Sequence, residues 1–187
     1  AEVDLYDVAT GLWTPTGPLF KERQDPLLFE LPDGTVIAGG GMATNFEFPA
    51  TTEIWDPATG QWSPGPELNS PRETPAAVQL ADGRIFVTGG RHDRDLVTVA
   101  TSEMFDPATG LWTETAPMAE ARLKHVATLL ADGRVLITGG GRPDGPYTKS
   151  AEVYDPTTDT WVSAGDMKLG RTMHTAVLLD DGRVLVI

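Results

Sequence analysis

The sequence predicts an all-β fold made of four copies of one four-stranded antiparallel unit. Three observations carry this prediction: Asp-Gly pairs recur in steps of 49, 50 and 49 residues, and tryptophans and diglycines recur with them. The members of these sets are Asp33-Gly34, Asp82-Gly83, Asp132-Gly133 and Asp181-Gly182; Trp13, Trp62, Trp112 and Trp161; and Gly39-Gly40, Gly89-Gly90 and Gly139-Gly140. A fixed period near 50 residues is typical of proteins built from structural repeats.

Each repeat is predicted to contain four strands. In one copy the first two segments are residues 75–80 and 84–88, and the Asp-Gly pair between them favours a hairpin because glycine takes positive φ without steric cost. The second segment is apolar and β-branched without alternation, which indicates burial on both faces. The third segment, 103–106, ends in an Asp-Pro-Ala-Thr-Gly turn, and the fourth carries the tryptophan. This order predicts an antiparallel meander.

One segment is rich in helix-forming residue types but is not predicted to be a helix. Residues 118–127 have this composition, whereas their repeat partner, 68–77, contains Pro71 and Pro75. Proline inside a helix removes a hydrogen bond and clashes with the preceding turn. Because repeats share one fold, we expect a loop followed by a strand in both segments.

A single four-stranded unit cannot bury both of its faces, whereas stacked copies can, and radial stacking of such sheets gives a β-propeller. Residues 130–140, the run 152–156 (Glu-Val-Tyr-Asp-Pro) and Trp161 together resemble the kelch repeat, and the resemblance covers nearly the whole chain. It implies a kelch-type β-propeller of four-stranded antiparallel blades, with the first segment innermost and the tryptophan segment outermost.

The chain is predicted to be a single propeller domain, or a propeller segment, over residues 1–187. It divides into half a blade, three blades and half a blade, and the approximate boundaries are 1–18, 19–67, 68–117, 118–166 and 167–187. The resemblance implies rings of about six or seven blades, within the usual range for propellers. We therefore expect a piece of a larger ring or an associating half-ring rather than a closed four-bladed ring.

Composition limits the classes of partner. The formal net charge of −13 disfavours nucleic acids and anionic membranes. Cysteine is absent, which excludes disulfides and zinc–cysteine sites and fits an intracellular or an exported bacterial protein; of these we favour a bacterial extracellular or periplasmic location. No apolar run approaches the ~20 residues of a membrane helix. We expect no cofactor and no bound metal.

The two faces of the predicted propeller differ. Both tight turns of each repeat lie on one face, and the longer loops, at 41–52, 91–102 and 141–151, lie on the other, which we call the long-loop face. The turns are nearly uniform in sequence, whereas the loops vary. Binding residues concentrate on loops held by a rigid scaffold, so we expect a partner to bind the long-loop face. Eleven of the fourteen Lys and Arg residues also fall there.

One arginine precedes the first strand of each repeat. These residues are Arg23, Arg72, Arg122 and Arg171. One interpretation places all four around the channel mouth, where they hold an acidic or phosphorylated ligand, with Arg72, Arg122 and Arg171 as the binding candidates. In the alternative, which we favour because a residue kept in every copy serves the repeat more often than a ligand, each guanidinium pairs with a repeated acid. The repeated acids are Glu53, Glu103 and Glu152.

The variable loops contain aromatic binding candidates. Phe46, Phe48 and Tyr147 suit anchoring of a partner or stacking on a sugar, and the alternative is that they fill local gaps in packing. His92 is a further binding candidate, in the run 92–95 (His-Asp-Arg-Asp). This run lacks the spacing of a calcium loop, so we interpret it as a solvated loop.

His125 and His174 are equivalent residues of adjacent repeats and are candidates for a shared metal site. No third ligand accompanies them, so a structural, hydrogen-bonded role is favoured.

The sequence lacks the motifs of the common enzyme classes. Galactose oxidase also resembles a kelch propeller, which implies copper and a cysteine-crosslinked tyrosine, but cysteine is absent here and Tyr6 and Tyr154 belong to the repeat. We expect a non-enzymatic scaffold that binds a protein or peptide, acidic ones included, through the long-loop face. Two alternatives stay open: a segment of a larger secreted carbohydrate-active protein, oxidase-like or lectin-like, and a half-propeller that self-associates through open blade edges.

Overall fold

The structure is a computed structural model that describes residues 2–44, 46–92, 97–142 and 145–187. Its regular elements are all β-strands, and three four-stranded antiparallel sheets form its centre. Blade A contains β3 (Leu27–Glu30), β4 (Val36–Gly39), β5 (Thr52–Asp56) and β6 (Gln61–Pro64). Blade B contains β7 (Ala76–Gln79), β8 (Ile85–Thr88), β11 (Ser102–Asp106) and β12 (Leu111–Thr115). Blade C contains β13 (Val126–Leu129), β14 (Val135–Thr138), β15 (Ser150–Asp155) and β16 (Thr160–Asp166).

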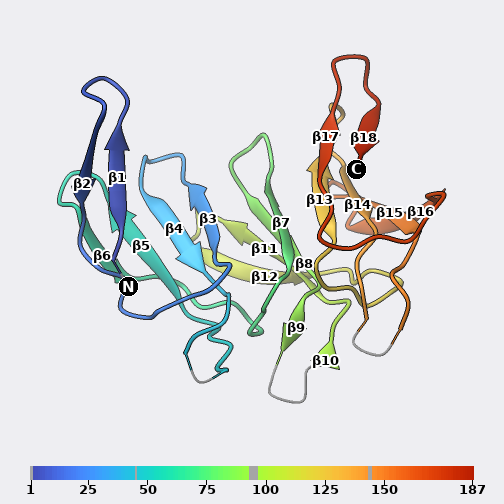
Figure 1. The fold of residues 1–187 in the computed structure, drawn as a ribbon, viewed down its shortest axis with the longest axis horizontal. Coiled ribbons are helices and arrows are strands. Elements are labelled where there is room, and N and C mark those ends of the chain that lie inside the picture. Colours follow the sequence, from blue (N-terminus) through green and yellow to red (C-terminus); the bar gives the residue numbers. More distant parts are fainter. Residues whose placement is uncertain (1, 45, 93–96, 143–144) are drawn as a thin grey trace.

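Two-stranded sheets complete the arrangement. The N-terminal half blade contains β1 (Asp4–Asp7) and β2 (Leu12–Pro15), and the C-terminal half blade contains β17 (Ala176–Leu178) and β18 (Val184–Val186). The half blades stand at opposite ends of an arc (Figure 1). A short ribbon, β9 (Arg91–His92) with β10 (Val97–Thr98), lies within a segment predicted to be a loop. No described helix has the length and apolar character needed to cross a membrane.

The sequence order of the strands is their order across each blade. Blade A runs β3-β4-β5-β6, blade B runs β7-β8-β11-β12, and blade C runs β13-β14-β15-β16. Strand β13 lies against β7 and β17, so the first strand of each repeat is innermost, as predicted. In Figure 1 the hairpin turns of β3–β4, β7–β8 and β17–β18 point upward, and the β4–β5, β8–β11 and β14–β15 connections lie at the bottom, which is the long-loop face. The segment rich in helix formers is indeed a loop followed by β13.

The register of the strands is repeated from blade to blade. The aromatic residue of each third strand lies opposite the tryptophan of the fourth: Tyr6 opposite Trp13, Trp55 opposite Trp62, Phe105 opposite Trp112 and Tyr154 opposite Trp161. The turn between these strands depends on its first aspartate. Asp56 Oδ1, for example, accepts a hydrogen bond from the Ala58 amide at 2.8 Å, and Asp106 and Asp155 do the same in their repeats.

The core lies between blades rather than within them. One buried cluster joins blades A and B and includes Ile37 and Phe105; a second joins blades B and C. In the second cluster the Phe86 ring stacks on Tyr154 with centroids 4.3 Å apart, and Trp161 lies at 6.0 Å. Strand β8 is buried along its whole length, as its unbroken apolar run predicted. Each blade therefore needs its neighbours, because its apolar faces are covered only by stacking.

Candidate functional site

The repeated arginines are buried, and this corrects the interpretation in which Arg72 and Arg122 face a ligand. Both are 0% exposed. Arg72 Nη2 lies 2.8 Å from Glu103 Oε1, and Arg122 Nη2 lies 2.9 Å from Glu152 Oε1. Arg23 pairs with Glu53 in the same way, at 3.1 Å. The physical reason is that the guanidinium fork fits a carboxylate and several carbonyls at once, which offsets the cost of burying its charge, although the Arg122 Nε has no hydrogen-bond partner among the described residues.

These arginines join neighbouring blades. The Arg72 side chain donates to the Gly89 carbonyl of its own blade at 2.9 Å, while the Arg72 carbonyl accepts the Gly41 amide of blade A at 2.9 Å. The diglycine is required at this junction: at Gly89, where φ is +63°, an added Cβ would lie 2.5 Å from the Arg122 carbonyl oxygen. The arginine, the diglycine and the acid therefore form one structural unit per repeat.

Arg171 differs from the other three arginines. It is partly buried, and its Nη1 donates to the Val186 carbonyl at 3.1 Å. Its Nε, like that of Arg122, has no hydrogen-bond partner among the described residues, but unlike the other three arginines Arg171 forms no ion pair with a described carboxylate. In the other repeats the paired acid follows its arginine by about 30 residues.

The surroundings of the two histidines favour a structural role over metal binding. His174 Nε2 lies 2.8 Å from Thr138 Oγ1, whereas neither ring nitrogen of His125 makes a well-formed hydrogen bond. Burial, reinforced by the nearby Arg122 guanidinium, lowers the pKa of His125 to about 3. Burial also lowers the pKa of His174. The described residues contain no group of three His, Cys, Asp or Glu side chains arranged to hold a metal.

Replacing His125 with proline is expected to weaken the pH dependence of stability. The folded protein holds His125 neutral, with a pKa of about 3, whereas the unfolded chain takes up a proton near its ordinary value of 6.5. The free energy of unfolding is therefore highest above pH 6.5 and decreases as the pH drops. Protonation of this group in the unfolded chain alone lowers it by about 2 kcal/mol between pH 7 and pH 5. Proline is accommodated because Pro26 and Pro75 occupy the equivalent position in other repeats.

Urea unfolding of both proteins at pH 7 and pH 5 measures this effect. The pH range from 5 to 7 lies above the ordinary pKa of carboxylates. His174, whose lowered pKa changes stability in the same direction, is present in both proteins and therefore contributes equally. Equal pH dependence of His125→Pro and the unmodified protein would show that His125 is not the titrating group.

The aromatic loop candidates are on the long-loop face but do not meet. Phe46 is 69% exposed in blade A, and Tyr147 is 62% exposed in blade C. Phe48 is partly buried, and the Arg91 guanidinium of blade B lies 5.9 Å from its ring centre, a cation–π contact that joins two blades. His92 is partly buried in β9 and holds a place in the ribbon. Its neighbours at positions 93–95 lie outside the described residues.

Tyr147 is held by a hydrogen-bonded support that the sequence did not reveal. Glu120 binds Ser150 Oγ at 3.0 Å and Thr148 Oγ1 at 3.3 Å, and its other oxygen lies 3.2 Å from Arg142 Nη2. These hydroxyl and guanidinium partners outweigh partial burial and lower the pKa of Glu120. The Tyr147 carbonyl lies so close to Gly170 that a Cβ there would collide with it. A carboxylate at position 120 occurs in one repeat only, which is why no repeat pattern pointed to it.

Exposed apolar side chains also separate the two faces. The tight turns consist mainly of Asp, Gly, Pro, Ala and Thr, and Val8 is an exposed apolar exception in the turn of the N-terminal half blade. The long-loop face instead carries large apolar side chains that are mostly exposed to solvent. They are Phe20, Phe46, Val97, Tyr147, Leu169 and Met173.

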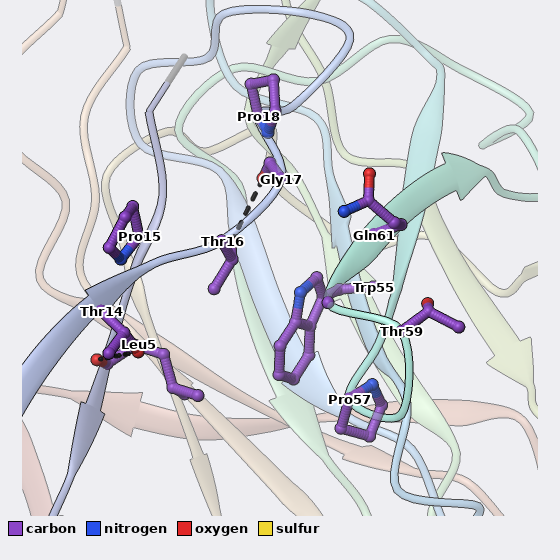
Figure 2. A pocket seen from close by; sticks show the side chains of 11 residues that line it. Leu5, Thr14, Pro15, Thr16, Gly17, Pro18, Trp55, Pro57, Thr59 and Gln61 are labelled. Carbon is purple, nitrogen blue, oxygen red and sulfur yellow. Dashed lines mark hydrogen bonds between the residues drawn. The ribbon is translucent and has the colours of Figure 1, made fainter.

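A groove of about 490 Å³ lies away from this face, between the N-terminal half blade and blade A. Figure 2 shows the Trp55 indole between Thr16 and Pro57 in this groove. Trp55 corresponds to Tyr154, on which Phe86 of the preceding blade stacks, but the N-terminal half blade contains only β1 and β2. The groove therefore belongs to the interface between the half blade and blade A rather than to a binding site.

The repeated sheets, their radial packing and the arginine–diglycine junctions define a kelch-repeat β-propeller. Comparison with protein families matches the family described as Kelch motif to residues 74–119 and 122–168, and the chain is a kelch-repeat protein. Among solved structures it is similar to the structure of YjhT, with a TM-score of 0.81 and 16% sequence identity over 100% of this chain and 68% of that one. No curated protein matches it in sequence comparison.

Proposed function

We propose that this protein is a non-enzymatic scaffold that binds a protein or peptide on its long-loop face. The observation that carries the proposal is the group of exposed large apolar side chains on that face, Tyr147 and Phe46 among them, opposite a face of polar turns. Exposed apolar groups of this kind mark interaction surfaces, and aromatic residues contribute most to the energy of such surfaces.

The scaffold beneath this surface supports the proposal. The buried Arg72–Glu103 and Arg122–Glu152 pairs hold each arginine within its own blade, while the arginine carbonyls accept the Gly41 and Gly90 amides of the preceding blades. Glu120 fixes both ends of the loop that carries Tyr147. A pre-organised aromatic side chain loses little conformational entropy on binding, which favours affinity.

We also place the arc in a ring of about six blades. Four repeats cover 68% of YjhT, which is close to the proportion of four blades in about six. In such a ring the free edges of β1 and β18 are paired. Leu185, which is 51% exposed on β18, belongs to an apolar face that a further blade would cover, and a second copy of the chain is one source of that blade.

A peptide-display experiment tests the binding surface. The protein is used to select from a random peptide library, and the affinity of the enriched peptides is measured by calorimetry. Tyr147→Ala and Phe46→Ala are each expected to weaken binding about 10-fold or more, which corresponds to loss of an interface anchor. The matched control is Val162→Ala, since Val162 is 55% exposed but lies on the outer strand β16. Equal affinity for all three variants, or no enrichment at all, would refute the proposed surface.

A further inference from the structure

One backbone position on the long-loop face is left-handed in every repeat, although glycine never occupies it. The position lies two residues after each repeated arginine, and φ is +51° at Asp25, +48° at Thr74, +53° at Lys124 and +53° at Met173. A residue with a Cβ is strained in this region, and most other left-handed positions of the described residues are glycines, with Phe46 and Asp159 as the exceptions. All four repeats have a residue with a side chain at this position, although glycine would avoid the strain. We therefore look for a role of these side chains that compensates for it.

Hydrogen bonds explain the backbone conformation but not the side chains. The Lys124 amide donates to the Thr74 carbonyl, and the Met173 amide donates to the Lys124 carbonyl, both at 3.1 Å. These bonds link the starts of adjacent inner strands, and glycine would make them equally well. The Lys124 and Met173 side chains are exposed and form no hydrogen bond or ion pair with the described residues.

Asp159 shows what a structural reason for such strain looks like. Its φ is +53°, and it lies at a tight turn on the opposite face. Its carboxylate accepts hydrogen bonds from the Tyr154 hydroxyl at 2.8 Å and from the Ala116 amide at 2.9 Å. Lys124 and Met173 have no comparable contacts, so folding does not account for their side chains.

Lys124 and Met173 adjoin the aromatic residue of the proposed surface. Thr172 Oγ1 donates to the Lys124 carbonyl at 3.2 Å. The Tyr147 ring and Thr172 both approach Gly141, at 3.7 and 3.8 Å from where its Cβ would be. The segments that carry Lys124, Met173 and Tyr147 are therefore neighbours on the long-loop face, and all three residues are exposed.

We infer that Lys124 and Met173 are specificity-determining residues that recognise an acidic residue next to an apolar residue in an extended peptide. The inference rests on the proposed function. Lys124 supplies a cation without a carboxylate partner, whereas the nearby Arg142 is already paired with Glu120. Met173 supplies an adaptable apolar contact for the neighbouring residue.

The test uses the same display library with Lys124→Gly, Met173→Gly and Lys124→Glu. Both glycine variants are expected to keep or raise the thermal midpoint, because strain is relieved, and to bind the enriched peptides about 5-fold or more weakly. Lys124→Glu is expected to change the selected residue from acidic to basic at one peptide position. The control, Asp159→Gly, relieves the same strain but loses two hydrogen bonds, so its midpoint falls while peptide affinity is kept.

The outcomes separate this inference from the proposed function. If the unmodified protein enriches peptides and the glycine variants bind them equally well, the specificity role is wrong and the binding surface stands. If the glycine variants lose stability without losing affinity, the side chains are structural. If the unmodified protein enriches no peptide, or binds only neutral oligosaccharides offered in parallel, the proposed function fails and the inference fails with it.

Discussion

Arg72→Met is expected to lower the free energy of unfolding by about 3–5 kcal/mol, the cost of breaking a buried ion pair from one side. Arg72 donates to Glu103 at 3.0 and 2.8 Å, to the Gly89 carbonyl at 2.9 Å and to the Thr101 carbonyl at 2.8 Å. Without it the Glu103 carboxylate stays buried with fewer donors, and the carbonyls of the junction lose their partner. Urea unfolding followed by tryptophan fluorescence measures the loss.

Arg84→Met is the matched control for this experiment. Arg84 pairs with Asp82 at 2.8 Å, but these side chains are 34% and 53% exposed, so we expect a change of about 1 kcal/mol or less. A stable Arg72→Met protein that no longer bound peptide would contradict the structural role and restore Arg72 as a ligand contact. The comparison therefore decides between the two interpretations of the repeated arginines.

Phe86→Ala is expected to cost about 3–5 kcal/mol, since a fully buried aromatic ring is removed from the junction of blades B and C. The ring stacks on Tyr154 and approaches Trp161, so its loss leaves a cavity in the middle of the apolar cluster that joins the two sheets. Thermal unfolding is expected to occur at a lower temperature and with lower cooperativity, because coupling between repeats depends on this interface.

Leu185→Ala provides the control, because Leu185 holds the equivalent position in the C-terminal half blade. It is about half exposed, so its truncation is expected to change stability far less than that of Phe86. If both substitutions destabilise the protein equally, Leu185 is covered in solution, as expected if another blade packs on this face in the proposed ring.

Much of the fold could be predicted because equivalent segments of different repeats must adopt the same structure and can be compared with one another. Residues 118–127 favour a helix by composition, but Pro71 and Pro75 in the partner segment exclude one, and the structure has a loop followed by β13. The β9–β10 ribbon was missed because the loop that contains it differs in sequence from the equivalent loops of the other repeats. Tertiary contacts can extend a loop into a short hairpin without any periodic signal.

The candidate site was less predictable than the fold. Arg72 and Arg122 had been considered as ligand contacts, yet burial removes them from the surface. Glu120 and the left-handed Lys124 and Met173 gave no signal, since their importance depends on neighbours from other repeats and on backbone angles. Periodicity identifies what the repeats share, whereas specificity depends on what they do not share.

The sequence by itself determined the kelch-repeat architecture, the strand order and the turns, because Asp-Gly, diglycine and apolar strand patterns impose local backbone geometry. Only the tertiary structure decided which charged residues are internal and which are available to a partner. Arg72 and Lys124 are both basic residues near the start of an inner strand, but one is enclosed by carbonyls and a carboxylate and the other faces solvent. That difference arises from the packing of one blade against the next, which no single repeat specifies.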